Sequence, residues 1–332
     1  MDEPKYNFNQ RRVRANEHIR SLVATVHLHH TEFIQPLFVE EVIEQRTPIA
    51  SLNEINTDSI ITVIEQIEAD MKNGIHKFLL FPIPKNKSNA NFSFQFITQV
   101  IKTIKQKFGN TIWIAADVCL CAYTTHGHCG ILNEQGNKIL NNASVQALAN
   151  YALELANAGA DCIAPSDMMD GRIKAIRNKL DEHQFDDVII MSYSSKFSSQ
   201  FYGPFRDACK STPGNGCSIY DRKSYQISPF NVHDAVQSAN RDAAEGADIL
   251  MVKPAVPYLD IIKALSTKNN IPIAAYHVSG EYQSIELLAM HHLLDRAKGH
   301  IEIWTALKRS GASIIISYAA RHAKSWIEKI EY

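Results

Sequence analysis

Eight short apolar runs, each followed by a longer stretch with helical spacing, constrain the fold of this chain more than any other feature. Most of these runs are continuously apolar rather than alternating, as expected for parallel strands that are buried on both faces. In a chain of 332 residues, eight such units predict an α/β fold with a single TIM barrel, in which helices surround a closed ring of parallel strands. The predicted strands are 36–39, 77–82, 112–118, 162–166, 188–194, 249–253, 271–278 and 313–318.

The stretches between the runs have the spacing of helices, and one additional helix is expected before the eighth strand. An open, doubly wound sheet is the alternative, but no GxGxxG or GxxxxGK[ST] motif follows any of the runs. We therefore expect residues 31–332 to form one barrel domain. Residues 1–30 are rich in Arg and Asn and cannot form a core alone, so we expect an extended arm that packs against another subunit. The predicted helices are 58–73, 94–107, 144–158, 171–180, 233–245, 258–267, 281–297 and 301–309.

The composition narrows the class of partner. The chain has 34 basic and 35 acidic residues and a formal net charge of -1, so no overall field favours nucleic acid or an anionic membrane. Its apolar runs are far shorter than the ~20 residues of a membrane-spanning helix, and its N-terminus lacks the apolar core of a secretory signal. We therefore expect a cytoplasmic protein that acts on a small molecule and binds neither nucleic acid nor membrane.

Two lysines end neighbouring predicted strands. Lys253 closes the sixth strand within GADILMVKPAVPY, and Lys196 closes the fifth. A single lysine in such a place more often extends to the rim of the barrel. Two ammonium groups on adjacent strands, however, lower each other's pKa, and burial lowers it further, so a free amine becomes available to attack a carbonyl. The pair therefore predicts two imine-forming lysines, and Asp117, at the end of the third strand, could carry a proton or orient a neighbour.

Three of the six cysteines lie in the stretch DVCLCAYTTHGHCG, directly after the third strand. Six cysteines in a chain of this length do not indicate a disulfide scaffold. Cys119, Cys121 and Cys129 have the spacing C-x-C-x7-C, unlike the C-x2-C pairs of zinc ribbons and thioredoxin-like sites. A redox pair, a structural zinc site completed by the two histidines, and an open zinc site all fit these residues. The open site is favoured, because three protein ligands with one exchangeable position are typical of catalytic zinc.

A long irregular stretch at 201–226 follows the fifth strand and is rich in Gly, Ser and Pro, which predicts a lid over the barrel mouth. Arg206 and Arg222 lie within it and could clamp a carboxylate when the lid closes, although either arginine alone is typical of a solvated loop. Ser279 and Tyr318 end the seventh and eighth strands and could donate hydrogen bonds to a second carboxylate. Such hydroxyls are, however, more often satisfied locally.

With these residues in place, the chain resembles the porphobilinogen synthase family, also called 5-aminolevulinate dehydratase. The likeness covers nearly the whole chain, from RRVR (11–14) to IIISY (314–318). It implies a hydro-lyase that condenses two molecules of 5-aminolevulinate into the pyrrole porphobilinogen, with loss of two waters, in tetrapyrrole and haem biosynthesis. The most specific blocks are DVCLCAYTTHGHCG, APSDMMDGR, MSYSSKFSSQFYGPFRDA, DRKSYQ, GADILMVKPAVPYLDI and HVSGEY.

The resemblance also implies a role for each candidate residue. Lys253 would hold the substrate that becomes the propionate side of the product, with its carboxylate bound by Ser279 and Tyr318. Lys196 would hold the second substrate, whose carboxylate meets the two lid arginines. Further family positions, with less specific roles, are matched by Asp117, Ser166 and Tyr202.

The resemblance implies one catalytic zinc per subunit on Cys119, Cys121 and Cys129, which would bind the second substrate as a Lewis acid. Many members also bind an allosteric magnesium through a glutamate; that position is Ser238 here, with Arg241 nearby, so we expect no magnesium of this type. The resemblance also implies a homo-octamer whose arms wrap neighbouring barrels. The alternatives are a non-catalytic zinc or redox sensor that retains the barrel, and another Schiff-base aldolase, which needs only one lysine.

Overall fold

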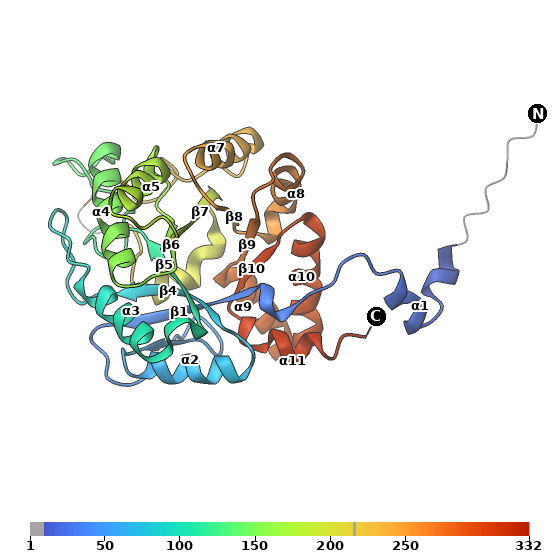
Figure 1. The fold of residues 1–332 in the computed structure, drawn as a ribbon. Coiled ribbons are helices and arrows are strands. Elements are labelled where there is room, and N and C mark those ends of the chain that lie inside the picture. Colours follow the sequence, from blue (N-terminus) through green and yellow to red (C-terminus); the bar gives the residue numbers. More distant parts are fainter. Residues whose placement is uncertain (1–9, 215–216, 332) are drawn as a thin grey trace, which may run out of the picture.

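Eight parallel strands close into a ring within residues 10–214 and 217–331, the part of the chain that this computed structural model describes. Each strand pairs with the next along the chain, and the last pairs with the first, which confirms the predicted TIM barrel (Figure 1). Residues 1–9 of the expected arm and 215–216 of the expected lid lie outside the described residues. The ring consists of β1 (Phe33–Glu40), β4 (Lys77–Ile83), β5 (Trp113–Val118), β6 (Cys162–Pro165), β7 (Ile189–Lys196), β8 (Ile249–Lys253), β9 (Ile273–His277) and β10 (Ile314–Ser317).

The strands form a ring because their side chains are apolar and find a buried surface on both sides. Every residue of β1 and of β8 is buried, as expected for a parallel sheet covered by helices. The sequence placed the first strand at 36–39, but β1 begins earlier, because Phe33 and Ile34 pair with Ile315 and Ile316 of β10. That pairing closes the ring.

The predicted helices all occur, but some boundaries were wrong: the helix expected at 58–73 begins at Thr62, and the one expected at 301–309 begins at Arg296. The helix expected at 281–297 ends at Met290, where the chain turns through His292 with a positive φ of 56°. The next helix then begins with Asp295 as its cap, whose carboxylate accepts a hydrogen bond from the Lys298 main chain. The helices around the barrel are α2 (Thr62–Lys72), α3 (Gln95–Phe108), α4 (Asn141–Asn157), α5 (Arg172–Glu182), α7 (Val232–Ala244), α8 (Leu259–Lys268), α9 (Ser279–Met290) and α10 (Arg296–Ser310).

Smaller elements decorate the barrel. Strand β3 (Asn56–Asp58) pairs in parallel with β1, and β2 (Thr47–Pro48) pairs antiparallel to β3. Helix α6 (Gly203–Ala208) belongs to the predicted lid, and α11 (Ala323–Ile327) follows the last barrel strand. Among the described residues, none of the helices combines the length and apolar character needed to cross a membrane.

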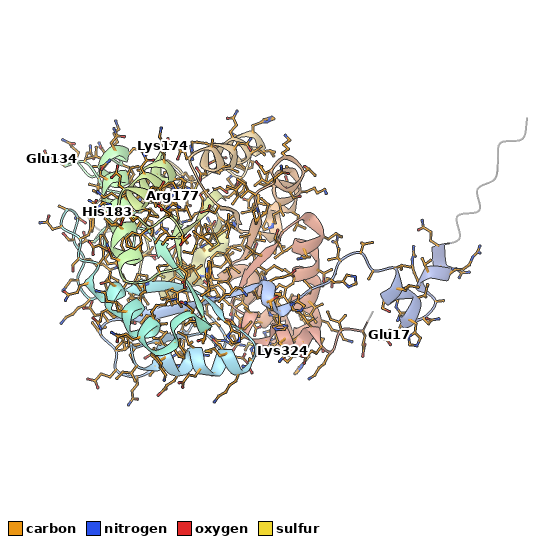
Figure 2. The ribbon with its side chains drawn as sticks, viewed as in Figure 1. Glu17, Glu134, Lys174, Arg177, His183 and Lys324 are labelled. Atoms are coloured by element: carbon orange, nitrogen blue, oxygen red, sulfur yellow. The ribbon has the colours of Figure 1, made fainter. Side chains whose placement is uncertain are left out.

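The N-terminal segment extends away from the barrel (Figure 1). Its 3-10 helix at Gln10–Arg14 and its helix α1 (Glu17–Leu22) bury no residue. In Figure 2 the side chain of Glu17 lies well apart from the barrel, whereas Glu134 lies at the opposite end of the molecule. The apolar side chain of Leu22 is 79% exposed, so residues 10–22 form no core of their own within a single chain.

Candidate active site

Lys196 and Lys253 lie side by side at the carboxyl ends of β7 and β8, where they are register partners. Only 5% and 3% of their surfaces are exposed. The Lys253 amine nitrogen (Nζ) lies 4.1 Å from the centroid of the Tyr276 ring and 4.9 Å from that of Tyr193. The Tyr193 ring is also 5.5 Å from the Nζ of Lys196. The structure therefore brings the two predicted lysines together among aromatic rings.

This environment changes the protonation of Lys253. Burial, together with the charge of Lys196, lowers the pKa of Lys253 to about 7, because an ammonium group loses its hydration inside the barrel. The carboxyl group of Asp117 interacts with both lysines. Burial raises the pKa of Asp117 to about 6, and the charges of the two lysines counteract that rise. A large part of Lys253 is therefore free amine at neutral pH, with a carboxyl group nearby that can exchange a proton.

Lys196 is tied to the next strand of the barrel. Its Nζ donates a hydrogen bond to the main-chain oxygen of Ser166, the residue that follows β6. The main-chain N–H of Ser166 in turn donates to the oxygen of Val118 at the end of β5, over 3.0 Å. Ser166 therefore lies beside Lys196, and it contacts the lysine through its main chain.

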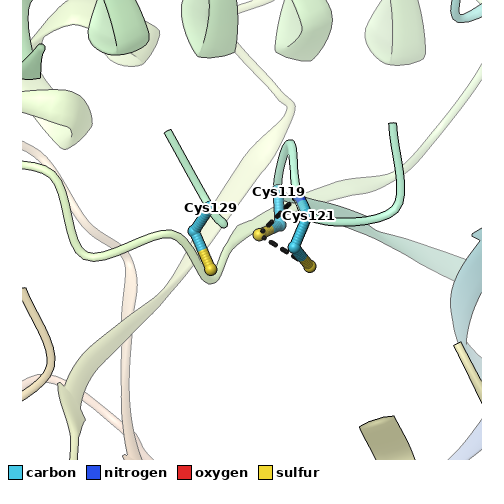
Figure 3. A group of neighbouring side chains, drawn as sticks. All are labelled: Cys119, Cys121 and Cys129. Atoms are coloured by element: carbon cyan, nitrogen blue, oxygen red, sulfur yellow. Dashed lines mark hydrogen bonds between the residues drawn. The ribbon is translucent and has the colours of Figure 1, made fainter. Parts of the chain in front are cut away.

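The three cysteines of the loop after β5 come together (Figure 3). Their sulfur atoms lie within 4.8 Å of one another, and the sulfurs of Cys119 and Cys121 are 3.2 Å apart. All three are free and buried. Hydrogen bonds from Cys119 and Cys121 lower the pKa of the Cys129 thiol well below its usual range, whereas burial raises the pKa of Cys119. The group is thus a soft donor set that already favours a thiolate, which fits zinc or a similar metal.

Neither histidine of the same loop belongs to the cysteine group among the described residues, although Nε2 of His126 has no hydrogen-bond partner there. The ring of His128 lies between the main-chain oxygen of Ile219, 2.9 Å from Nε2, and the Tyr225 hydroxyl, 3.0 Å from Nδ1. His126 accepts a hydrogen bond at Nδ1 from the His128 main chain, and burial lowers the pKa of His126 to about 4. Within the described part of the chain, only the cysteines form a group with metal-ligand spacing. A structural site closed by histidine therefore fits this geometry less well than an open three-cysteine site.

The two lid arginines lie at different depths. Arg222 is buried, and its Nη2 donates to the main-chain oxygens of Gly127 (2.9 Å) and Ser211 (2.8 Å). Arg206 is half-buried, and its Nη2 donates to the oxygen of Ser199 over 3.4 Å. The Nε of each arginine has no hydrogen-bond partner among the described residues. Each side chain therefore retains a donor that an anion could use.

The predicted hydroxyl groups are found at the ends of the last strands. Ser279 begins α9, and its Oγ donates to the main-chain oxygen of Phe201 and accepts from the N–H of Phe205. Tyr318 follows β10, and its hydroxyl lies 3.3 Å from that of Tyr276. The Ser279 hydroxyl is thus engaged by the lid, so an anion that binds it must compete with these main-chain groups.

Tyr202 supports the strand ends rather than presenting a free hydroxyl. Its Oη lies 2.9 Å from the main-chain oxygens of both Phe197 and Lys253. Its ring faces the Lys253 amine, with 5.5 Å between Nζ and the ring centroid, and it faces the guanidinium of Arg206 at 5.8 Å. Tyr202 thereby connects the lid to the ends of β7 and β8.

The sequence analysis missed two tyrosines beside the lysines, Tyr193 and Tyr276, and a buried glutamine in the lid, Gln226. Both tyrosines lie within apolar strands, where an aromatic residue is usually part of the core. Gln226 is buried, yet neither its Oε1 nor its Nε2 has a partner in the described part of the chain. The following residue, Ile227, donates from its main chain to the oxygen of Lys196. The signal that could have revealed Gln226 is its place at the end of the DRKSYQ block.

The chain is similar to known proteins over nearly its whole length. A family model described as Delta-aminolevulinic acid dehydratase matches residues 7–326. The chain is 40% identical to the delta-aminolevulinic acid dehydratase of Bacillus subtilis (strain 168) over 326 residues, 97% of this chain and 98% of that protein. It is 43% identical to that of Methanothermus sociabilis over 314 residues, 93% of this chain and 95% of that protein. Among solved structures, the Toxoplasma gondii ME49 enzyme in complex with the reaction product porphobilinogen has a TM-score of 0.91 and 36% identity, covering 99% and 93% of the two chains.

Proposed function

Because this chain belongs to the delta-aminolevulinic acid dehydratase family, we propose that its buried lysine pair and cysteine group perform that family's reaction. The protein condenses two molecules of 5-aminolevulinate into porphobilinogen, with loss of two waters, as a step of tetrapyrrole biosynthesis. The observation that carries this proposal is the register of β7 and β8, which sets Lys196 level with Lys253 inside the barrel. Two amines at this spacing can hold two ketone substrates within reach of each other.

Lys253 begins the chemistry as a nucleophile. Its amine attacks the ketone carbon of one 5-aminolevulinate molecule, a carbon–nitrogen bond forms, and the oxygen leaves as water to give an imine. The pKa of Lys253, lowered to about 7, supplies the free amine for this attack. Asp117 accepts the protons that the lysine nitrogen loses and donates them to the departing oxygen. Its pKa of about 6 allows it both to take up and to release a proton near neutral pH.

Lys196 forms the corresponding imine with the second substrate. The aromatic rings around both lysines exclude water, which protects the imines from hydrolysis. The two carboxylates are bound by different groups: Ser279 and Tyr318 bind the first substrate's carboxylate, and the lid arginines bind the second. The support for this division is that Arg206 and Arg222 each keep an unpartnered Nε. Ser166 and Tyr202 hold the main chain around the lysines through the contacts described above.

We propose that the metal of this site is zinc, one per subunit, held by Cys119, Cys121 and Cys129. The support is the donor set, because three buried sulfurs within 4.8 Å are the soft ligands that zinc prefers over magnesium. When bound there, zinc supplies a Lewis acid that polarises an oxygen of the second substrate. The fourth position would be open to solvent or substrate, since neither loop histidine belongs to the cysteine group among the described residues.

An allosteric magnesium of the glutamate type is not part of this proposal. Ser238 stands at that position, and its Oγ accepts a hydrogen bond from Arg241 over 3.0 Å. The same guanidinium pairs with the carboxylate of Asp170 at 2.7 Å. A fixed cation therefore already neutralises the acidic group there, which removes a reason for a divalent cation to bind.

We also propose that the protein acts in the cytosol as a homo-octamer. A reducing compartment keeps the metal-binding cysteines as thiols. The support is that these cysteines form no disulfide in the structure. Residues 1–30 form the arm and residues 31–332 the catalytic barrel. The support for the arm's role is that its described helices bury nothing within one chain.

The test of this function is trapping of the imines together with detection of product. The protein is incubated with 5-aminolevulinate and zinc, the pyrrole is measured, and parallel samples are reduced with sodium borohydride for peptide mass spectrometry. We expect porphobilinogen, and an adduct on Lys253 that depends on substrate. Lys253→Met should abolish both, whereas Lys298→Met, at an exposed lysine paired with Glu331, should behave as the wild type. Absence of both pyrrole and adduct in the zinc-loaded wild type would contradict the synthase function. A non-catalytic sensor or another enzymatic activity would then be the better hypothesis.

A further inference from the structure

Tyr193 and Lys196 both face the interior of the barrel, although they are three residues apart in one strand. The Tyr193 ring lies 5.5 Å from the Nζ of Lys196 and 4.9 Å from that of Lys253. In a regular strand, side chains alternate between the two faces, so residues three apart point in opposite directions. The strand must therefore be interrupted between Tyr193 and Lys196.

The interruption is a β-bulge in β7. Ser192 is the register partner of Leu250, and Ser195 is the partner of Val252, so β7 advances three residues while β8 advances two. One extra residue thus lies in β7 between Ser192 and Ser195, and the paired residue Ser195 follows it before the lysine. Without it, Ser195 rather than Lys196 would stand level with Lys253, and the lysine side chain would turn to the other face of the sheet.

One side chain bonds to the strand opposite the bulge. The Ser194 hydroxyl accepts a hydrogen bond from the main-chain N–H of Met251 (3.2 Å) and donates one to the main-chain oxygen of the same residue (3.3 Å). Met251 lies in β8 between the two registered pairs, and both residues are fully buried. The serine thus links the extra segment of β7 to β8 through a side chain, where a regular ladder uses main-chain groups.

Two other serines of β7, Ser192 and Ser195, are held from the helical side of the barrel. Ser195 donates its hydroxyl proton to the main-chain oxygen of Ala235 in α7, over 2.8 Å. Ser192 donates to the carboxylate of Asp242 in the same helix, over 2.6 Å. These bonds anchor β7 to its covering helix, and they do not connect β7 with β8. Ser195 is therefore a matched neighbour of Ser194: both are buried serines with bonded hydroxyls, but they bond to different elements.

We propose that Ser194 is a positioning residue of the reaction, which stabilises the β7 bulge and so keeps Lys196 level with Lys253. This inference rests on the proposed function, because only chemistry that uses both amines requires them to be level. The pairing of β7 with β6 ends at Ile190, before the bulge, whereas β8 pairs with β9 up to Val252, the residue before Lys253. Loss of the Ser194 hydroxyl should therefore displace Lys196 and leave Lys253 in place.

The experiment compares the zinc-loaded wild type with Ser194→Ala and Ser195→Ala. The probe is 4-oxopentanoate, which has the ketone and carboxylate of the substrate but no amine, so it can form an imine with either lysine without closing a pyrrole. Each imine releases water, and borohydride reduces it to a secondary amine that peptide mass spectrometry assigns. The rate of porphobilinogen formation and the melting temperature are measured on the same preparations.

We expect Ser194→Ala to lower kcat about 10- to 100-fold, the range for a misplaced reacting group. Its adduct on Lys196 should fall relative to the adduct on Lys253, while its melting temperature falls no further than that of Ser195→Ala. Equal kcat values for the two variants, or an unchanged ratio of the two adducts, would overturn the role of Ser194. If the wild type forms neither pyrrole nor adducts, the proposed function fails instead, and the inference falls with it.

Discussion

Lys253 illustrates how the barrel changes the chemistry of a single residue. In water its amine is protonated at neutral pH, but aromatic rings and a second lysine surround it here. Burial removes hydration from the ammonium group, and Lys196 adds repulsion, so the pKa of Lys253 falls to about 7. Asp117 faces the same group and opposes the fall. The outcome is an amine that is nucleophilic at the pH of the cell.

The pH dependence of imine formation tests this balance. The free amine is the reactive form, so trapping on Lys253 in the wild type should rise with pH through about 7 and level off above it. Lys196→Met removes the repulsion but not the burial, so the pKa of Lys253 should rise and the trapping curve should move to higher pH. The measurement is the rate of borohydride trapping with 4-oxopentanoate at a series of pH values. A curve for Lys196→Met that stays in place, or moves to lower pH, contradicts this account.

The loop after β5 shows how one element gathers ligands. The chain turns back so that the Cys121 main chain donates to the Cys119 sulfur, over 3.5 Å. Farther along, Gly127 has a positive φ of 73°, and a side-chain carbon there would lie 2.7 Å from the main-chain oxygen of Thr212 in the lid. A glycine is needed at this position for both reasons. The lid and the cysteine loop can therefore pack closely, and Arg222 bonds to both.

Removal of one sulfur tests the metal assigned to this loop. Cys129→Ser should lose most of the roughly one zinc per subunit expected of a three-cysteine site, together with pyrrole formation, because the remaining two sulfurs hold the metal weakly. Metal analysis and activity are measured after chelation and reloading with zinc or with magnesium. The control is Cys217→Ser, because Cys217 is not a member of the cysteine group. Full recovery of the chelated wild type with magnesium alone contradicts the zinc site.

At the scale of the whole molecule, the described part of the arm (residues 10–30) has two helices that bury no residue within a single chain. Three apolar side chains in or beside these helices are exposed. Exposed apolar residues on a segment without a core favour packing against a partner. The residues concerned are Val13 (42% exposed), Leu22 (79%) and Val23 (45%).

Deletion of the arm tests its role in assembly. A variant without residues 1–22 should retain the barrel, because the ring and its covering helices begin only at Phe33. Its molar mass in solution should, however, be that of an assembly smaller than the proposed octamer. The measurements are light scattering coupled to size-exclusion chromatography, with circular dichroism as the control for folding. A folded variant of unchanged mass would show that the arm does not hold the subunits together.

Much of this protein could be predicted from its residues alone. The eight barrel strands follow from continuous apolar runs, because a strand buried on both faces must be apolar along its length. The two lysines were recognised because each ends a strand, and the three cysteines because they cluster in the loop after one, and the active sites of barrels lie at that face. Short-range signals did less well at the boundary near Met290, where a turn through His292 interrupts a helix that the spacing continues.

Tertiary structure decided which of these residues come together and in what register their strands pair. The amino-acid sequence determined the barrel, the lysines and the cysteines, because each depends on residue type and position along one segment. It did not determine that Lys196 stands level with Lys253, since that register depends on an extra residue in β7 and on the Ser194 hydroxyl reaching the neighbouring strand. Pairing between strands joins segments far apart in the chain, and a shift of one residue turns a side chain to the opposite face.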